Sequence, residues 1–115
     1  MKIAIIGSRG FNDYDKLKAN LEFYIDKATL LISGGAKGAD SLGERWAKEN
    51  EIPTQIFYPD WDKHGKSAGY IRNKDIVANA DLIIAFWDGV SKGTKHSIDI
   101  ALESNKKLLV ITYGK

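Results

Sequence analysis

The sequence predicts a single doubly wound α/β domain, with a five-stranded, mainly parallel sheet flanked by four main helices. Two observations predict this class: short apolar runs alternate with segments of helical periodicity, and polar loops containing glycine follow the first, second and fourth runs. Strands that alternate with helices pair in parallel through right-handed crossovers, which place helices on both faces of the sheet. A chain of 115 residues supports one hydrophobic core. We therefore expect residues 1–115 to form one domain.

The first half of the chain contains three of the expected strands and two of the helices. The apolar runs predict strands at 2–6, 29–33 and 55–58. A helix opened by Asp13 or its neighbour carries one apolar stripe, formed by Leu17, Leu21, Tyr24 and Ala28. A second helix over 39–49 ends before Pro53, and its apolar side is formed by Ala39, Leu42, Trp46 and Ala47.

The second half begins with the longest stretch that lacks periodicity, residues 59–66, which we expect to be irregular. A helix is expected from Ser67 to about Asn79, followed by the most apolar strand at 81–87 and a polar loop at 88–93. The last strand is expected at 107–113. The helix before it presents one face formed by Thr94, Ile98, Ala101, Leu102 and Asn105.

Composition and charge exclude several classes of function. The chain has no cysteine, so disulfides and thiolate metal sites are excluded, and the two histidines do not have the spacing of a metal pair. The apolar runs are too short to span a bilayer and no secretory signal is evident, so we expect a cytoplasmic protein without a membrane partner. The formal net charge is only +2 and basic residues are scattered, which argues against a nucleic-acid partner.

The polar loops indicate a ligand site. In open parallel sheets, ligands bind at the carboxyl ends of the strands, where diverging loops leave a crevice. Small residues bring the backbone close to a ligand, and the first amides of a helix have no internal partner, so this pattern favours a phosphorylated small molecule. Neither a P-loop nor a dinucleotide fingerprint matches, and we expect no metal and no cofactor. The candidate loop residues are Gly7, Ser8, Arg9, Gly34, Gly35, Ala36, Lys37, Gly38, Asp40, Gly93 and Thr94.

Arg72 and Asn73 are further candidates. Each precedes an apolar residue, Ile76 or Val77, by four positions, so both lie on the inward face of their helix, at its end nearest the site. An arginine there either holds a phosphate or carboxylate with its planar fork or bonds to loop carbonyls in a structural role. The asparagine is placed to read a sugar hydroxyl or a base edge. The pattern leaves both alternatives open.

The remaining polar and aromatic candidates are ambiguous. Asp40 either caps its helix or binds a ribose hydroxyl, and Lys37 either adds charge to an anion site or is solvated. Trp61 either stacks on a base or anchors its loop on the core. His96 falls on the polar face of its helix and is expected at the surface, whereas His64 lies in the long loop and is a weak candidate for facing the crevice.

Six short motifs together carry a family resemblance. In order, they are Gly7-Ser8-Arg9-x-Phe11, Gly34-Gly35-Ala36-x-Gly38-Ala39-Asp40, Trp61 with Gly65, Ala68-Gly69-x-x-Arg72-Asn73, Ala80-Asp81 and Gly93-Thr94. This combination covers nearly the whole chain and resembles the YspA-like branch of the SLOG superfamily. SLOG domains are Rossmann-like modules that bind nucleotides or their derivatives, and their relatives include the LOG phosphoribohydrolases and the DprA DNA-processing proteins. The resemblance implies a nucleotide-like ligand and, because small relatives often assemble, a homo-oligomer.

One departure from the LOG pattern bears on catalysis. LOG enzymes carry a catalytic Glu after the Gly-Thr pair, and that position in this sequence is Ser97. A serine supplies no carboxylate to stabilise an oxocarbenium charge or to activate water. We therefore expect binding of a nucleotide-derived ligand, as a sensor or sequestering module. The alternatives are an N-glycosidase acting on nucleoside monophosphates and a DprA-like binder of single-stranded DNA.

Overall fold

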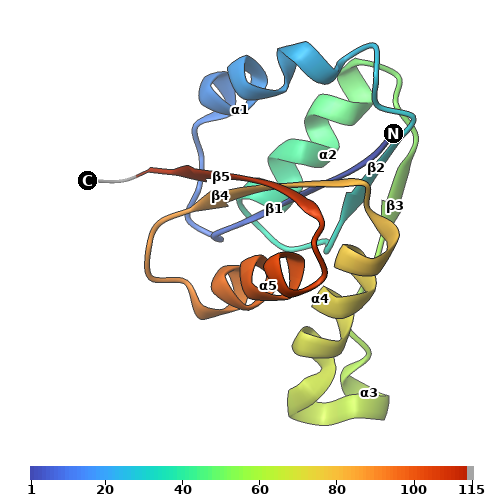
Figure 1. The fold of residues 1–115 in the computed structure, drawn as a ribbon, viewed down its shortest axis with the longest axis vertical. Coiled ribbons are helices and arrows are strands. Elements are labelled where there is room, and N and C mark those ends of the chain that lie inside the picture. The colour runs from blue at the N-terminus through green and yellow to red at the C-terminus, as the bar shows by residue number, and fades with distance from the viewer. Residues whose placement is uncertain (114–115) are drawn as a thin grey trace.

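A computed structural model describes residues 1–113 and shows a five-stranded parallel sheet with the strand order β3-β2-β1-β4-β5 (Figure 1). The expected fold class is confirmed. The strands are β1 (Lys2–Gly7), β2 (Leu30–Ser33), β3 (Thr54–Ile56), β4 (Leu82–Trp87) and β5 (Lys107–Thr112). The helices are α1 (Tyr14–Leu21), α2 (Ala39–Glu49), α3 (Trp61–His64), α4 (Ala68–Asn79) and α5 (Lys92–Glu103), with 3-10 turns η1 (Glu22–Tyr24) and η2 (Gly65–Ser67).

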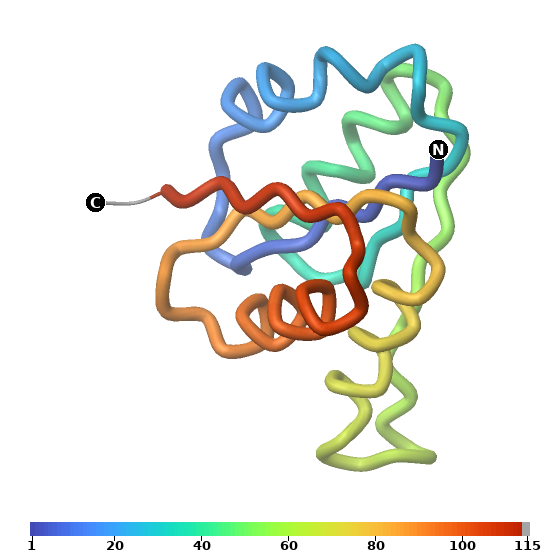
Figure 2. Tube along the Cα trace, viewed as in Figure 1, coloured from blue at the N-terminus to red at the C-terminus, as the bar shows by residue number. Residues whose placement is uncertain are grey.

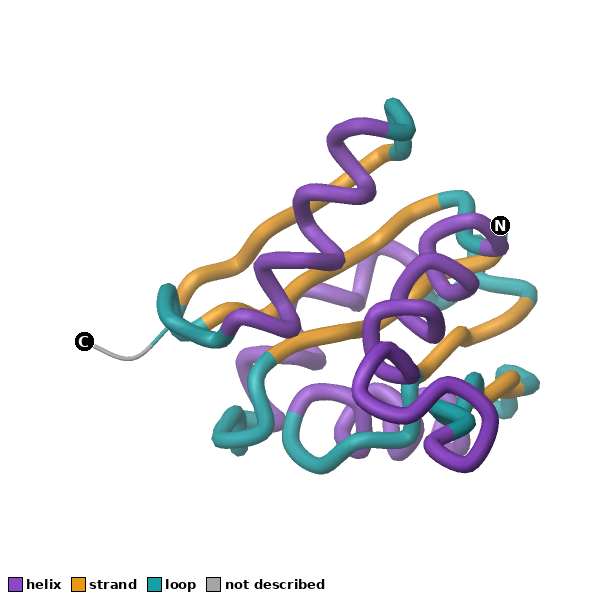
Figure 3. Tube along the Cα trace, turned by 90° about the horizontal axis from the view of Figure 1, so that it is seen from below, coloured by secondary structure: helices purple, strands orange, loops and turns teal. Residues whose placement is uncertain are grey.

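Helices cover both faces of the sheet, as the alternating pattern predicts. The side chains of β1 alternate between two cores, with Ile3 and Ile5 facing α1 and α2 and with Ala4 and Ile6 facing α4 and α5. Figure 3 shows the strands lying between these two layers of helices. Strands β1 and β4 pair in register, with Ile5 opposite Ile84, and both are buried on two faces. Burial on both faces explains why the sequences of β1 and β4 are continuously apolar.

The order of the strands reverses between β1 and β4, because the chain crosses from the β3 edge to the other side of β1 (Figure 2). The loops after these two strands therefore start side by side and run apart. The Ser8 amide donates to the Phe86 carbonyl at 3.0 Å, and the Asp88 amide donates to the Ser8 hydroxyl at 3.2 Å. The fold thus places its crevice at this end of the sheet.

Asp13 caps α1 as expected, with its carboxylate accepting the Lys16 amide at 3.0 Å. The α-helix ends at Leu21 and the 3-10 turn η1 ends at Tyr24, so Ala28 lies beyond the helix, although it packs against the same core. The prediction that Leu102 belongs to the buried face of α5 is wrong, because it is 61% exposed. Helix α5 also begins at Lys92, inside the stretch expected to be loop.

The prediction that residues 59–66 are irregular is also wrong. Asp60 accepts the Lys63 amide at 3.1 Å and so caps the single-turn helix α3, which leads through η2 into α4. In Figure 1 this segment projects beyond the sheet at the lower end of the molecule. Among residues 1–113, no helix combines the length and the apolar character needed to cross a lipid bilayer.

Candidate functional site

The loops at the carboxyl ends of the strands enclose a crevice made of two adjoining compartments. The inner compartment has a volume of about 470 Å³ and is lined mainly by hydroxyl groups, carboxylates and backbone; its residues include Ser8, Asp40, Asp88, Ser91, Thr94 and Ser97. The outer compartment has a volume of about 510 Å³ and is lined by Gly34, Gly35, Tyr58, Trp61, Lys66 and Tyr70 among others. Five residues line both compartments, and we call them the junction: Arg9, Ala36, Arg72, Asn73 and Gly93.

Asp40 stabilises the glycine turn that follows β2. Its Oδ2 atom accepts the amide of Gly34 at 3.0 Å and the amide of Ala36 at 3.3 Å. The residue is 6% exposed, and this burial raises the pKa of Asp40 to about 6, although the two amides and Arg72 lower it. Asp40 therefore holds the turn that precedes α2 and does not cap its own helix, and it also lines the inner compartment.

Arg72 reaches from α4 to the same turn. Its Nη1 atom donates to the Gly34 carbonyl at 2.6 Å, and its Nε atom donates to Oδ1 of Asn73 at 3.0 Å. Partial burial lowers the pKa of Arg72, an effect that Asp40 opposes and Arg9 reinforces. Within residues 1–113, Nη2 has no hydrogen-bond partner, so one arm of the guanidinium fork remains available in the junction.

Asn73 extends this network to α5. Its amide nitrogen lies 3.4 Å from the Gly93 carbonyl and 3.3 Å from Nδ1 of His96. The expectation that His96 lies on the open surface is wrong: the ring is half-buried and packs edge-on against Tyr70, with 4.5 Å between the ring centroids. Burial lowers the pKa of His96, so the neutral imidazole predominates at neutral pH.

Gly38 brings the start of α2 against the loop that follows β1. A Cβ atom at this position would lie 2.4 Å from the Ser8 carbonyl oxygen and 2.5 Å from that of Arg9, and the backbone has a φ of +77°. Glycine is therefore required at position 38 because the backbone of the neighbouring loop lies too close for a side chain and because φ is positive. Gly38 does not line either compartment, and neither does its neighbour Lys37, which is exposed.

The first turn of α5 closes the crevice on the side of β4. The carboxylate of Asp88 accepts the amides of Val90 and Ser91, which holds the pKa of Asp88 below its usual value. The Ser91 and Thr94 hydroxyls lie 3.2 Å apart. In the described part of the chain, the amides of Lys92 and Gly93 have no acceptor, as is usual for the first residues of a helix. Of these two residues, Gly93 lies at the junction, so its amide is available there.

Three aromatic rings surround the outer compartment. Trp61 is 57% exposed, so the interpretation that it anchors its loop on the core is wrong. Its ring lies above Gly69, and the Tyr58 ring lies so close to Gly35 that a Cβ there would be 2.7 Å from it. Tyr70 forms a third side. Large exposed aromatic side chains gathered at a pocket are typical of a binding surface.

The sequence predicted about half of the residues that line the crevice and missed the others. The predicted residues that line it are Gly7, Ser8, Arg9, Gly34, Gly35, Ala36, Asp40, Trp61, Arg72, Asn73, Gly93 and Thr94. His64 is half-buried and lines neither compartment. Among the missed residues, Asp88 stands directly after β4, and that position was the signal that identified the other loops. Tyr58 was expected inside a strand, whereas β3 ends at Ile56 and Tyr58 lines the outer compartment. Among residues 1–113 there is no group of three metal-ligating side chains.

The family relationship follows from a comparison of sequences. A model of the YspA, cpYpsA-related SLOG family matches residues 1–64, more than half of the chain. The chain belongs to this family. The predicted resemblance is thereby confirmed. Another relative of this SLOG chain is the gene 61 protein of Mycobacterium phage D29, which is 32% identical over 122 residues, covering 98% of the chain and 96% of the phage protein.

Solved structures show the same fold for the SLOG chain. DNA processing protein A (DprA) from Streptococcus pneumoniae superposes with a TM-score of 0.79 at 18% identity, over 98% of this chain. The DprA from Helicobacter pylori, studied for its single-stranded DNA binding mode, gives 0.74 at 23% identity over 99% of this chain and 66% of its own. The protein TM1055 gives 0.71 at 21% identity, covering 93% of this chain and 71% of its own. The chain spans half the length of the Streptococcus pneumoniae DprA.

Proposed function

We propose that this domain binds a nucleotide or a nucleotide-derived ligand through its phosphate, which lies at the junction between the two compartments. The observation that carries the proposal is the meeting of Arg9 and Arg72 with the first turn of α5 at that point. Two guanidinium groups and a helix N-terminus together favour an anion. A base stacks among the aromatic rings of the outer compartment.

Preorganisation of Arg72 supports the proposal. Two of its nitrogen atoms are held by Gly34 and Asn73, which fixes the plane of the guanidinium group before a ligand arrives. Binding then requires little loss of side-chain freedom, and that loss normally weakens contacts made by arginine. Arg9 is exposed and has no ion-pair or hydrogen-bond partner within residues 1–113, so its charge is also available.

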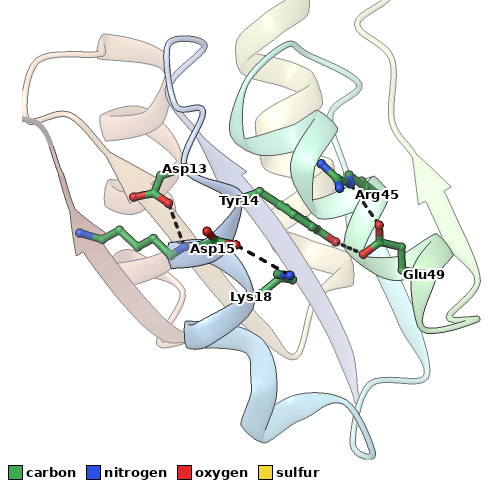
Figure 4. Close-up of polar contacts among 7 residues, drawn as sticks. Asp13, Tyr14, Asp15, Lys18, Arg45 and Glu49 are labelled. Carbon is green, nitrogen blue, oxygen red and sulfur yellow. Dashed lines mark hydrogen bonds and ion pairs between the residues drawn. The ribbon is translucent and has the colours of Figure 1, made fainter.

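Isothermal titration of the protein with nucleoside mono- and diphosphates tests the proposal. Wild type should bind at least one of them, and Arg72→Ala should weaken binding by roughly tenfold or more, since charge-assisted hydrogen bonds contribute about 1.5–3 kcal/mol. The matched control is Arg45→Ala. Arg45 lies on the outer side of α2, where it pairs with Glu49 and covers the Tyr14 ring (Figure 4). Absence of binding by wild type, or equal losses in the two variants, would refute the proposal.

Binding of single-stranded DNA is a second candidate function, because Tyr58, Trp61 and Tyr70 are exposed beside Lys66. Aromatic rings interspersed with cations are the usual platform for unpaired bases. The small net charge of the chain makes this the weaker candidate. A salt-dependent gel shift with single-stranded DNA that Trp61→Ala abolishes would favour it, and the absence of a shift would exclude it.

A further inference from the structure

The charges in the crevice are arranged in three successive zones. Arg9 and Arg72, the two arginines of the crevice, lie at the junction, and the outer compartment adds aromatic rings and Lys66. Among residues 1–113, no lysine or arginine lines the part of the inner compartment beyond the junction. Its polar side chains are the carboxylates and hydroxyls of Ser8, Asp40, Asp88, Ser91, Thr94 and Ser97. This end of the crevice therefore suits a group that is neutral and donates hydrogen bonds.

Asp40 shows most directly that the inner end of the crevice suits a hydrogen-bond donor. The residue is more than nine-tenths buried and its Oδ2 atom holds the glycine turn. In the described part of the chain, its Oδ1 atom has no hydrogen-bond partner, and the residue lines the inner compartment. None of the side-chain oxygens in the described residues is both fully buried and unpartnered, so this Oδ1 atom is accessible from the compartment, where it favours a ligand group that donates a hydrogen bond. A hydroxyl group does so, whereas a phosphate at the same place would face like charge.

We infer that the ligand is a nucleoside diphosphate joined to a sugar, with its base in the outer compartment, its diphosphate at the junction and the hydroxyl-rich sugar in the inner compartment. This inference rests on the proposed function and names the class of ligand. Two arginines match two linked phosphate groups. The inner hydroxyls and the carboxylate of Asp40 match the several hydroxyls of a sugar, which both donate and accept hydrogen bonds.

The size of the crevice agrees with this assignment. Each compartment is about as large as a small ligand pocket, at 470 and 510 Å³. A nucleoside monophosphate whose base occupies the outer compartment and whose phosphate reaches the junction leaves the inner compartment empty. A terminal sugar linked through the second phosphate fills it.

Titration calorimetry with two matched series tests the inference: UMP, UDP and UDP-glucose, and AMP, ADP and ADP-ribose. In at least one series, wild type should bind the sugar-linked diphosphate roughly tenfold or more tightly than the free diphosphate, as expected for hydrogen bonds to a charged group. Asp40→Asn should reduce this ratio to near one. Ser97→Ala should reduce it by a few-fold, and Ser104→Ala, which removes a hydroxyl from the far end of α5, should leave it unchanged.

The outcomes separate this inference from the function on which it rests. If free diphosphates bind as tightly as the sugar-linked ones, the inference is wrong and the proposed function stands. If the sugar strengthens binding but Asp40→Asn and Ser97→Ala both keep the full ratio, the sugar lies elsewhere and the inference is also wrong. If no nucleotide of either series binds to wild type, both the inference and the proposed function fail. Circular dichroism of each variant verifies that it is folded.

Discussion

The Nη1 atom of Arg72 donates a hydrogen bond of 2.6 Å to the carbonyl oxygen of Gly34, which lies 38 residues away in the sequence. The same glycine gives its amide to Asp40. One residue without a side chain thus holds an arginine from α4 and a carboxylate from α2 at the end of β2. The spacing of these two opposite charges around the crevice depends on it.

Gly34→Ala should therefore disturb the crevice more than the fold. The new Cβ atom would lie 2.7 Å from Nη1 of Arg72 and 2.8 Å from Oδ2 of Asp40, so both side chains must move. Because these atoms are the ends of flexible side chains, we expect a loss of only about 1 kcal/mol in the free energy of unfolding. We expect nucleotide affinity to fall roughly tenfold. Urea denaturation and calorimetry measure the two effects, and a large loss of stability with unchanged affinity would contradict this prediction.

Gly38→Ala should weaken the fold more than it disturbs the crevice. Its Cβ atom would meet the carbonyl oxygens of Ser8 and Arg9 at 2.4 and 2.5 Å, and backbone atoms cannot move aside cheaply. The backbone conformation of Gly38, with φ of +77° and ψ of −127°, adds a penalty of about 1–3 kcal/mol for a residue with a side chain. We expect a loss of about 2–4 kcal/mol in the free energy of unfolding. Gly10→Ala is the control for denaturation, since a Cβ there meets nothing within 4 Å. Equal stability of the two variants would count against the close approach.

The fold was predictable because its signals are local. Buried parallel strands read as continuous apolar runs, and a helix shows its inward side by the spacing of its apolar residues. Arg72 could be placed at the crevice for that reason, four positions before the buried Ile76. Helix α3 could not be predicted, because a single turn capped by Asp60 is too short to show any period.

The details of the crevice depend on backbone directions that the sequence does not specify. Gly35 and Gly38 both have a positive φ, and in the turn between them Ala36 lines the junction whereas Lys37 is exposed and lines neither compartment. The role of Tyr58 and Tyr70 could not be predicted from the sequence either, because an aromatic residue at a strand end or in a helix packs in the core as readily as it lines a pocket. Only the three-dimensional arrangement separates these uses.

Wild type should release no free base when it is incubated with nucleoside monophosphates. Ser97 is buried at the wall of the inner compartment, and its hydroxyl supplies no negative charge to an oxocarbenium-like transition state. Liquid chromatography of the reaction mixture measures the release. Base that appears in proportion to protein concentration would instead support the N-glycosidase alternative, and Asp40→Asn would then show whether the buried carboxylate has taken over the chemistry.

Asp40→Asn should also change how stability depends on pH. The pKa of Asp40 in the folded protein, about 6, lies above the ordinary aspartate pKa of 3.8, because burial disfavours the ionised form. Between these two values the folded state binds more protons than the unfolded state, so this residue's contribution to stability falls as the pH rises from about 4 to 6. Asparagine resembles the protonated acid and does not titrate. The free energy of unfolding of the variant should therefore match that of wild type near pH 4 and exceed it by up to about 3 kcal/mol at pH 7.

Asp88→Asn is the matched control, for which we expect a change of the opposite sign, because the amides of Val90 and Ser91 lower the pKa of Asp88 and stabilise its ionised form. Urea denaturation of the three proteins from pH 4 to 8 measures these differences, and a difference for Asp40→Asn that does not vary with pH would contradict the prediction.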